Sequence, residues 1–295
     1  MRCTVRPALY WRFVVGFNAR SAAAVNPVPI EPPTGGARAC GGVIVVIVAL
    51  TMASCAESLS PTSPSSLSPS TFGVGWFYDG QAWQASGVPA PCPTPLTSTT
   101  PVNLSRVTSI LYPGQNRGGW YKPHGGFRFD EPGETGEITV VAPMVSTVYR
   151  ASRALDNGEI QYMFDFINGC GILHRLGHLR DLSPRFQQIA ASLPPAVEGD
   201  SRTLRVASGQ NVTVGETIGT AVGYLSGNFS LDWGVYDLRA RNEASEDPAW
   251  LSQHSGEFAP YAICWFDHLS PGDRTIVRSL PPADWQNGAT SDSCC

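Results

Sequence analysis

The residues with the clearest chemical potential are histidines that stand close to charged side chains in short, glycine-containing segments. His124 lies in "WYKPHGGFRFD", residues 120–130, with Arg128 four places on and Asp130 six places on. His174 and His178 are also four residues apart, in "GILHRLGHL". Because residues i and i+4 of a β-strand share a face, each segment presents a pair of side chains to one side of a sheet. Imidazole and carboxylate groups are the usual protein ligands of zinc.

Arg128 argues against a metal beside His124. A guanidinium keeps its charge and has no lone pair to donate, so it repels a divalent cation. Asp130 lies two residues beyond Arg128, a shift of roughly 6–7 Å along a strand. Only a bulge would bring its carboxylate level with the position of Arg128. His174 and His178 remain as a weak metal pair. Cys170 with His174 suggests a thiol nucleophile, but no third residue is in place to orient the histidine.

The segments that must position these residues have the pattern of short strands. The composition, with 30 glycines and 25 prolines, favours many turns over long helices. One short helix is expected at 183–193, with Ser183 as N-cap and Pro184 at the first position. After residue 245 the chain is expected to be irregular, apart from 261–269. Apolar and alternating patterns predict strands at 106–112, 137–142, 145–152, 160–167, 171–179, within 204–225 and at 230–239.

Three stretches resemble the lysostaphin-type (LytM-like) peptidase domain, a zinc endopeptidase fold that cuts cell-wall peptide cross-links. They are "VAPMVSTV", "HRLGHLRDLSP" and the hairpin "VTVGETIGTAVGYLSGN". The resemblance covers roughly residues 110 to 240. It implies a mainly β fold, a sandwich or barrel-sandwich-hybrid-like antiparallel sheet with one short helix. The hairpin also occurs in biotinyl and lipoyl carriers, but it contains no lysine here, since Lys122 is the sole lysine.

The family binds zinc through a His-x3-Asp pair and the last histidine of a His-x-His strand. On this pattern His124 matches the first ligand and Arg128 replaces the aspartate. His178 matches a further active-site histidine. Alignment of "LDWGVYDLR" with the His-x-His strand places Trp233 and Val235 at the histidine positions, and neither binds metal.

The resemblance therefore implies a degenerate site, with no catalytic residue and no zinc expected. Arg128 is expected to take the place and the positive charge of the metal, paired to Asp232 or Asp130.

Three functions remain open from these residues. The first is a non-catalytic protein whose groove binds cell-wall peptidoglycan or another envelope protein. The alternative is an active zinc-dependent peptidoglycan endopeptidase with a rearranged metal site. The third is a structural domain without a ligand. The candidate ligands of the rearranged site are His124, Asp130, His174 and His178.

The N-terminal part has the pattern of a bacterial lipoprotein signal. Arg38 precedes the apolar run "CGGVIVVIVALTMASC", which is too short for a membrane span of roughly 20 residues. "MASC" resembles a lipobox, so Cys55 is expected to carry the lipid that anchors an exported protein to a membrane of the bacterial envelope. An ordinary secretory signal, and a true start later in the chain, are the alternatives. Only 15% of residues are charged and the net charge is −4, which argues against a nucleic-acid partner.

The cysteines and tryptophans add two expectations. Export favours disulfides, and Cys264 is expected to pair with Cys294 or Cys295 and so fix the tail to the domain. Trp76, Trp83 and Trp120 are candidates for stacking on glycan or for packing in the core. The expected regions are a signal region at 1–54, a Ser/Pro-rich stalk at 55–71, an extension at 72–104, the peptidase-like domain at 105–243 and a C-terminal extension at 244–295.

Overall fold

The structure is a computed structural model that describes residues 74–283 and 288–294. The chain divides into two units, Met1–Ser66 and Leu67–Cys295, and all described residues belong to the second. The expected signal region, the lipidation site Cys55, the stalk and Cys295 lie outside the described residues. In the described part of the chain, no helix has the length and apolar character that a membrane crossing requires.

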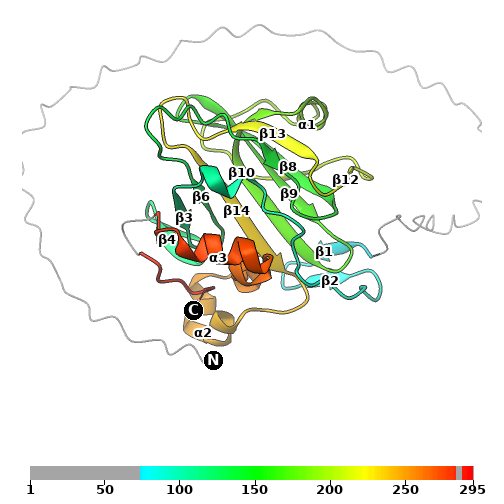
Figure 1. Cartoon of the computed structure of the whole chain (residues 1–295). Coiled ribbons are helices and arrows are strands. Elements are labelled where there is room, and N and C mark those ends of the chain that lie inside the picture. The colour runs from blue at the N-terminus through cyan, green and yellow to red at the C-terminus, as the bar shows by residue number, and fades with distance from the viewer. Residues whose placement is uncertain (1–73, 284–287, 295) are drawn as a thin grey trace, which may run out of the picture. The chain divides into compact units, whose positions relative to one another are not determined.

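The expectation of a mainly β fold is confirmed, and one antiparallel sheet dominates it (Figure 1). Two short strands extend the sheet: β12 (Asn211–Val212) pairs with β8, and β13 (Thr217–Val222) pairs with β10 and with β7 (Val140–Val141). The described strands do not close into a barrel. In spatial order, the main strands are β11 (Leu204–Arg205), β8 (Ser146–Asp156), β9 (Glu159–Ile167), β10 (Ile172–Leu182), β14 (Ser230–Asp237), β6 (Gly125–Arg128) and β3 (Ser109–Leu111).

Both faces of the long strands are covered. Phe164 and Phe166 of β9 alternate into the main core, as their spacing predicts, whereas Ile160 near the start of the strand is 44% exposed. A second apolar cluster includes Leu173 of β10 and Tyr236 of β14 together with the separate hairpin β1 (Trp76–Tyr78) and β2 (Trp83–Ala85). Trp76 and Trp83 are therefore core residues.

Three α-helices flank the sheet where the sequence predicted one. α1 (Pro184–Ala190) follows Ser183 as expected and buries Phe186. The expectation of irregular chain after residue 245 was wrong, since α2 (Pro248–Gln253) and α3 (Pro271–Ser279) lie there. Each has proline in its first turn, after the capping side chain of Asp247 or Ser270, respectively. Short 3-10 turns occupy Leu104–Arg106, Glu243–Glu246, Ala259–Tyr261 and Trp265–His268.

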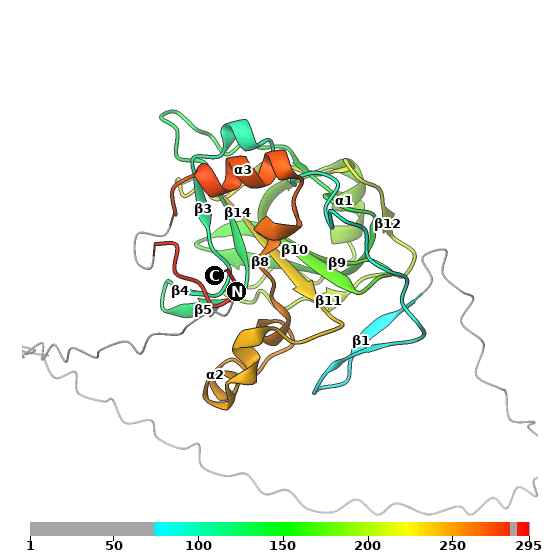
Figure 2. The ribbon, with the colours of Figure 1, turned by 60° about the horizontal axis from the view of Figure 1, so that its bottom comes forward.

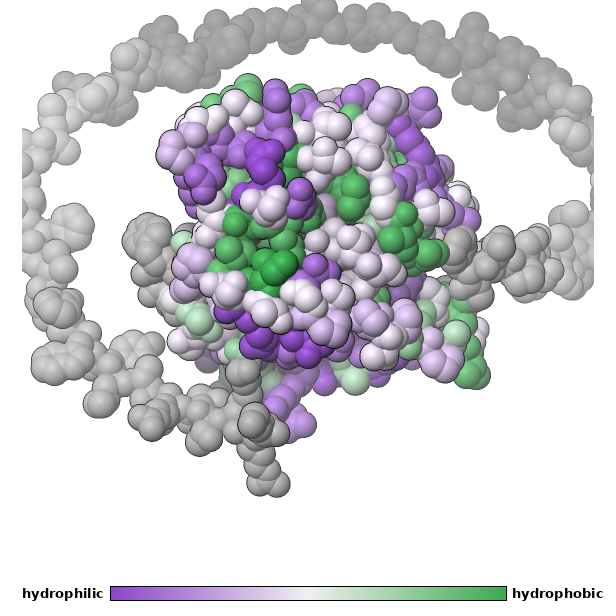
Figure 3. Space-filling view, in the orientation of Figure 1, coloured by the Kyte–Doolittle hydropathy of each residue, from purple (hydrophilic) through white to green (hydrophobic). Residues whose placement is uncertain are grey.

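The helices differ in position and surface. Figures 1 and 2 place α2 and β1 toward the same lower side of the domain, away from α1. Figure 3 shows apolar side chains gathered around the position of α3, with hydrophilic side chains around them. Ile276 of α3 is 45% exposed.

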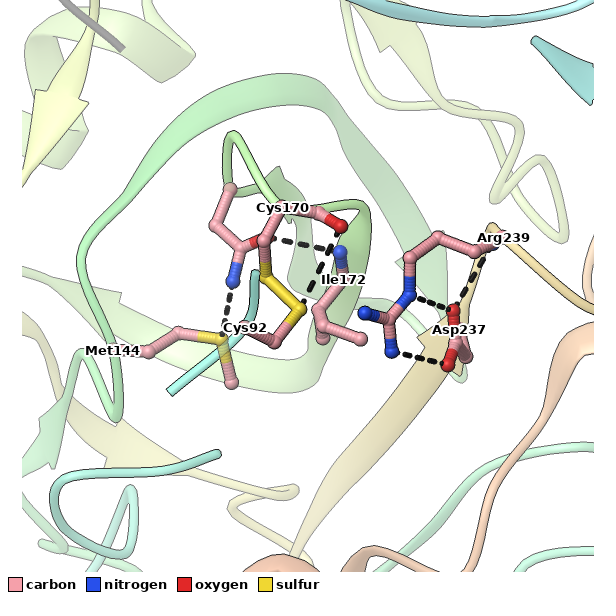
Figure 4. The surroundings of a disulfide bond; sticks show 7 residues. Cys92, Met144, Cys170, Ile172, Asp237 and Arg239 are labelled. Atoms are coloured by element: carbon pink, nitrogen blue, oxygen red, sulfur yellow. Dashed lines mark hydrogen bonds and ion pairs between the residues drawn. A yellow bond between two sulfur atoms is a disulfide. The ribbon is translucent and has the colours of Figure 1, made fainter. Parts of the chain in front are cut away.

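Two disulfides hold the extensions against the sheet. Cys264 pairs with Cys294, which is one of the two predicted pairings. Cys92 pairs with Cys170 and so ties the Pro/Thr-rich segment 88–101 to the turn between β9 and β10 (Figure 4). Cys170 is therefore not a free thiol, and the suggestion of a thiol nucleophile was wrong.

A separate hairpin, β4 (Gln115–Arg117) and β5 (Trp120–Lys122), is fixed by the tail that follows α3. The Gln115 side-chain amide donates to the carbonyl oxygens of Gly288 at 2.8 Å and Thr290 at 2.7 Å. The Asp292 amide donates to the Gly114 carbonyl at 3.0 Å. Residues 288–294 thus brace the hairpin, and the Cys264–Cys294 disulfide holds them in place.

Candidate functional site

One open pocket gathers several of the candidate residues, and we refer to it as the histidine pocket. Its volume is about 310 Å³. Two arginines, one lysine and two histidines share its wall with a single carboxylate. The lining residues are Leu111, Arg117, Gly118, Lys122, His124, Arg128, His178, Asn228, Ser230, Asp232 and Ala283.

The glycines of "HGGF" let three strands meet behind this pocket. Asp232 of β14 lies opposite Gly126 of β6 on one side and opposite Gly177 of β10 on the other. A Cβ atom on Gly125 would lie 2.4 Å from the Leu111 carbonyl oxygen, and one on Gly126 would lie 2.1 Å from the Leu231 carbonyl oxygen. No larger residue fits at either position, so the glycine pair sets the approach of the strands that carry His124 and Asp232.

Asp232 joins the two histidines at the centre of the pocket. Its Oδ2 atom lies 3.1 Å from His124 Nε2 and 3.4 Å from His178 Nε2. Burial opposes ionisation of Asp232, but the neighbouring His124 and His178 outweigh it and hold the pKa of Asp232 well below its usual range. Burial also lowers the pKa of His124, and the charge of Asp232 only partly opposes this. Asp232 is thus ionised at neutral pH and holds both imidazoles in place.

His178 has a second partner that determines its proton arrangement. His178 lies at a register shift in β10. Its backbone has a φ of +58°, which is rare outside glycine. The Tyr224 hydroxyl donates to Asp156 Oδ2 at 2.6 Å, and the Tyr224 oxygen lies 3.3 Å from His178 Nδ1. Since the hydroxyl has a single proton, His178 Nδ1 must donate to it.

The arginines on the pocket wall are held by oxygen atoms. Arg117 donates to the His124 carbonyl at 2.8 Å and to the Tyr112 carbonyl. Arg128 donates to Asp130 at 2.6 Å and to the Asn228 side chain at 2.6 Å. Of the two carboxylates expected to pair with Arg128, the structure therefore selects Asp130, whereas Asp232 pairs with the histidines.

The assignment of Trp233 and Val235 to the pocket was wrong. These side chains are 0% and 1% exposed, and Trp233 stacks on Phe127 with ring centroids 5.8 Å apart. Because side chains alternate along a strand, a shift by an odd number of residues moves every residue to the opposite face. The pair of β14 residues that faces the pocket is Ser230 and Asp232.

The residues of the rearranged zinc site are not brought together. His174 is fully buried, contacts Ser146 Oγ at 3.3 Å and stacks on Phe166 at 4.6 Å. Burial lowers the pKa of His174 to about 3. Asp130 pairs with Arg128, and only His124 and His178 lie in the pocket.

The residues present fit a zinc ion poorly. Asp232 and the two histidines are of the right chemical type, but they share a wall with Arg117, Lys122 and Arg128, whose charges oppose a divalent cation. Within residues 74–283 and 288–294, no group of three or more His, Cys, Asp or Glu residues is arranged to hold a metal.

Sequence reasoning named Asp232 only as a partner of Arg128, and it did not predict the contacts of Asp232 and Tyr224 with the histidines. The facing of Asp232 could have been predicted from the sequence. Alternation along residues 230–237 puts its side chain on the face opposite to those of the apolar Leu231 and Trp233. Tyr224 and Asp156 were not detectable, since they are 68 residues apart in sequence and no local pattern joins them.

Comparisons with protein families and with curated proteins give no match to this chain. Among solved structures, the chain is similar to Csd3 of Helicobacter pylori, with a TM-score of 0.28 and 14% sequence identity. The match covers 69% of this chain and 45% of that chain, so it spans less than half of the Csd3 structure. A likeness this distant carries no argument about the pocket, whose chemistry rests on its own residues.

Proposed function

We propose that this protein is a non-catalytic, lipid-anchored component of the bacterial cell envelope, whose histidine pocket binds an anionic group of cell-wall material or of a partner protein. The observation that carries the proposal is the composition of the pocket wall. Arg117, Lys122 and Arg128 face one lining carboxylate, Asp232. Lysine and arginine bind carboxylates through charge-assisted hydrogen bonds, and peptide chains of the cell wall end in carboxylates.

The state of the individual side chains supports binding over catalysis. Asp232 is occupied by two imidazoles at 3.1 and 3.4 Å, so it is not available as a general base for water. Arg128 stands where the zinc enzymes of the resembling family place an aspartate. Asp130 compensates the charge of Arg128 at 2.6 Å. Lys122 is the pocket cation that the proposal assigns to the bound anion.

Two disulfides support the export part of the proposal. Cys92–Cys170 and Cys264–Cys294 need an oxidising compartment to form and persist. Lipidation at Cys55 remains a proposal from the sequence, and mass spectrometry of the mature N-terminus tests it. A free, unmodified N-terminus beyond residue 55 would contradict the anchor.

Co-sedimentation with isolated peptidoglycan tests the binding function, and Lys122→Ala is the decisive variant. Its matched control is Arg202→Ala, which removes the same charge from a side chain that is 86% exposed and lies outside the pocket. We expect Lys122→Ala to reduce the bound fraction and Arg202→Ala to leave it unchanged. Equal binding by both variants and the native protein would contradict the pocket's role.

Metal analysis of the purified full chain separates this proposal from the alternative of a zinc-dependent peptidoglycan endopeptidase. We expect substoichiometric zinc after dialysis and no release of wall peptides. One zinc per chain that is lost in His124→Ala would favour the enzyme.

A further inference from the structure

The β4–β5 hairpin places one tryptophan beside the histidine pocket. In its register Arg117 lies opposite Trp120, and Gln115 lies opposite Lys122. Directly opposite residues of an antiparallel pair have side chains on the same face, and Trp120 also shares a face with Lys122, two positions on. Since Arg117 and Lys122 both line the pocket, Trp120 extends the same face at the pocket's edge.

The hairpin holds this arrangement rigidly. Gly118 and Gly119 form its two-residue turn with φ values of +58° and +82°, the conformation that tight hairpins require. On the opposite face, Tyr121 packs edge-on against His254 at 4.0 Å and against Trp250 at 5.8 Å. The tail residues brace the β4 strand from its other end. Trp120 is therefore exposed on a hairpin that is fixed from several sides, and not on a loose loop.

Trp120 is the most exposed of the tryptophans that the structure describes, and Trp250 is partly buried. Trp120 is 74% exposed, whereas Trp76, Trp83, Trp233 and Trp265 are at most 7% exposed. A large apolar ring left in water beside a charged pocket is typical of a binding surface. The face of an indole is electron-rich and flat, which suits the polarised C–H face of a sugar ring.

We propose that Trp120 and the histidine pocket form a two-part site for a saccharide that carries a carboxylate. The sugar ring stacks on the Trp120 indole, and the carboxylate reaches Lys122 at the pocket wall. This inference rests on the proposed function, because it requires that the pocket binds anions. It adds the ligand class and assigns Trp120 a role that the pocket lining alone does not show.

Three small probes and two variants of the full chain test this assignment. N-acetylmuramic acid has both the ring and the carboxylate, N-acetylglucosamine has the ring alone, and D-lactate has the carboxylate alone. Dissociation constants are measured by ligand-observed NMR for the native protein, Trp120→Ala and the control Phe77→Ala. Phe77 of β1 is 46% exposed and lies outside the pocket.

We expect the native protein to bind N-acetylmuramic acid more tightly than either partial probe. Trp120→Ala should weaken that binding by roughly tenfold, as aromatic stacking on a ligand ring typically does, with the lactate affinity unchanged. Phe77→Ala should change neither affinity.

The contrary outcomes are distinct. Lactate binding together with an unchanged affinity of Trp120→Ala for N-acetylmuramic acid would overturn the two-part site and leave the proposed function standing. Equal affinities of the native protein for the two sugars would show that the carboxylate is not recognised. Failure of all three probes to bind would overturn both proposals.

Discussion

Two charged clusters lie on the same face of the sheet and are built in opposite ways. The first is the histidine pocket around Asp232. The second, which we call the arginine network, consists of Arg150, Asp165, Arg175 and Glu257. Arg175 shares a strand face with Gly177, which lies opposite Asp232, so the clusters are neighbours on one surface of the same strands.

The arginine network is balanced and covered. Asp165 is 0% exposed, and its two oxygens accept bonds from Arg150 at 3.2 Å and from Arg175 at 2.6 and 2.9 Å. Glu257 binds Arg150 with both oxygens, and the Phe258 ring lies 4.4 Å from the Arg175 guanidinium. Two cations meet two anions, and the segment after α2 closes over them.

The histidine pocket has an excess of positive groups and stays open to solvent. Charges that stabilise a fold are matched and enclosed, since an unmatched buried charge is costly. A cation such as Lys122 at the wall of an open pocket attracts an anion from solvent. The contrast between the two clusters therefore separates a structural role from a binding role on a single sheet, and four substitutions test it.

Asp165→Asn should have the largest effect. It leaves Arg150 and Arg175 beside each other without their shared anion, and neither guanidinium can release its proton. We expect a loss of about 3–5 kcal/mol in the free energy of unfolding, as found when one partner of a buried ion pair is removed, measured by urea denaturation at neutral pH. Asp200→Asn, at an exposed pair, is the control and should leave the unfolding midpoint unchanged. A loss as small as that of the control would show that the network is not structural.

His174→Gln should remove a pH dependence that belongs to the core. The folded pKa of His174 is about 3, so as pH falls below about 6.5 the unfolded chain binds a proton that the folded chain does not. The contribution of neutral His174 to the free energy of unfolding is therefore full above this pH and declines below it. The decline is about 1.36 kcal/mol per pH unit, or about 2.7 kcal/mol at pH 4.5. Urea denaturation at pH 4.5 and 7.5 should show a smaller difference for the variant. An unchanged difference would mean that His174 is not buried in its neutral form.

Asp232→Asn should cost far less than Asp165→Asn, about 1 kcal/mol, a loss typical of one hydrogen-bonded contact. The reason is that an imidazole is stable in its neutral form without a carboxylate beside it, whereas a guanidinium keeps its charge. The affinity for D-lactate should rise, because the pocket loses its only lining carboxylate. A loss in stability equal to that of Asp165→Asn would remove the distinction between the two clusters.

Lys122→Ala should have the smallest effect on stability, within about 0.5 kcal/mol, as for most surface substitutions. Its effect on anion binding should nevertheless be clear, with a weaker affinity for D-lactate. Thermal unfolding and ligand titration of the same preparation measure both quantities. A destabilised variant with unchanged affinity for D-lactate would show that Lys122 has a structural role and no binding role.

The sequence predicted the elements whose signals are local. Strand alternation located β8, β9, β10 and β14, and Ser183 with Pro184 located α1. The same signal precedes α2 at Asp247 and α3 at Ser270, but the low apolar content of these segments concealed it. The Cys92–Cys170 bond was missed because residues 88–101 have no regular pattern from which their position on the sheet follows.

The pocket was predicted in part. His124, His178 and Arg128 could be placed there because each occupies a recognisable position of a family pattern. Trp233 and Val235 were misplaced because the alignment was offset by three residues from Ser230 and Asp232, and an odd offset inverts the facing of a strand. The Tyr224–Asp156 contact depends on tertiary packing alone.

The bracing of the β4–β5 hairpin by residues 288–294 has a consequence for the biogenesis of this protein. Ribosomes release a chain at about 5–20 residues per second, and Gln115 is separated from its acceptor Thr290 by 175 residues. Residues 115–122 therefore emerge roughly 10–35 seconds before the segment that supports them. Arg117 and Lys122, which form part of the pocket wall, therefore leave the ribosome well before the residues that fix their hairpin, and the pocket is complete only after residues 288–294 have docked.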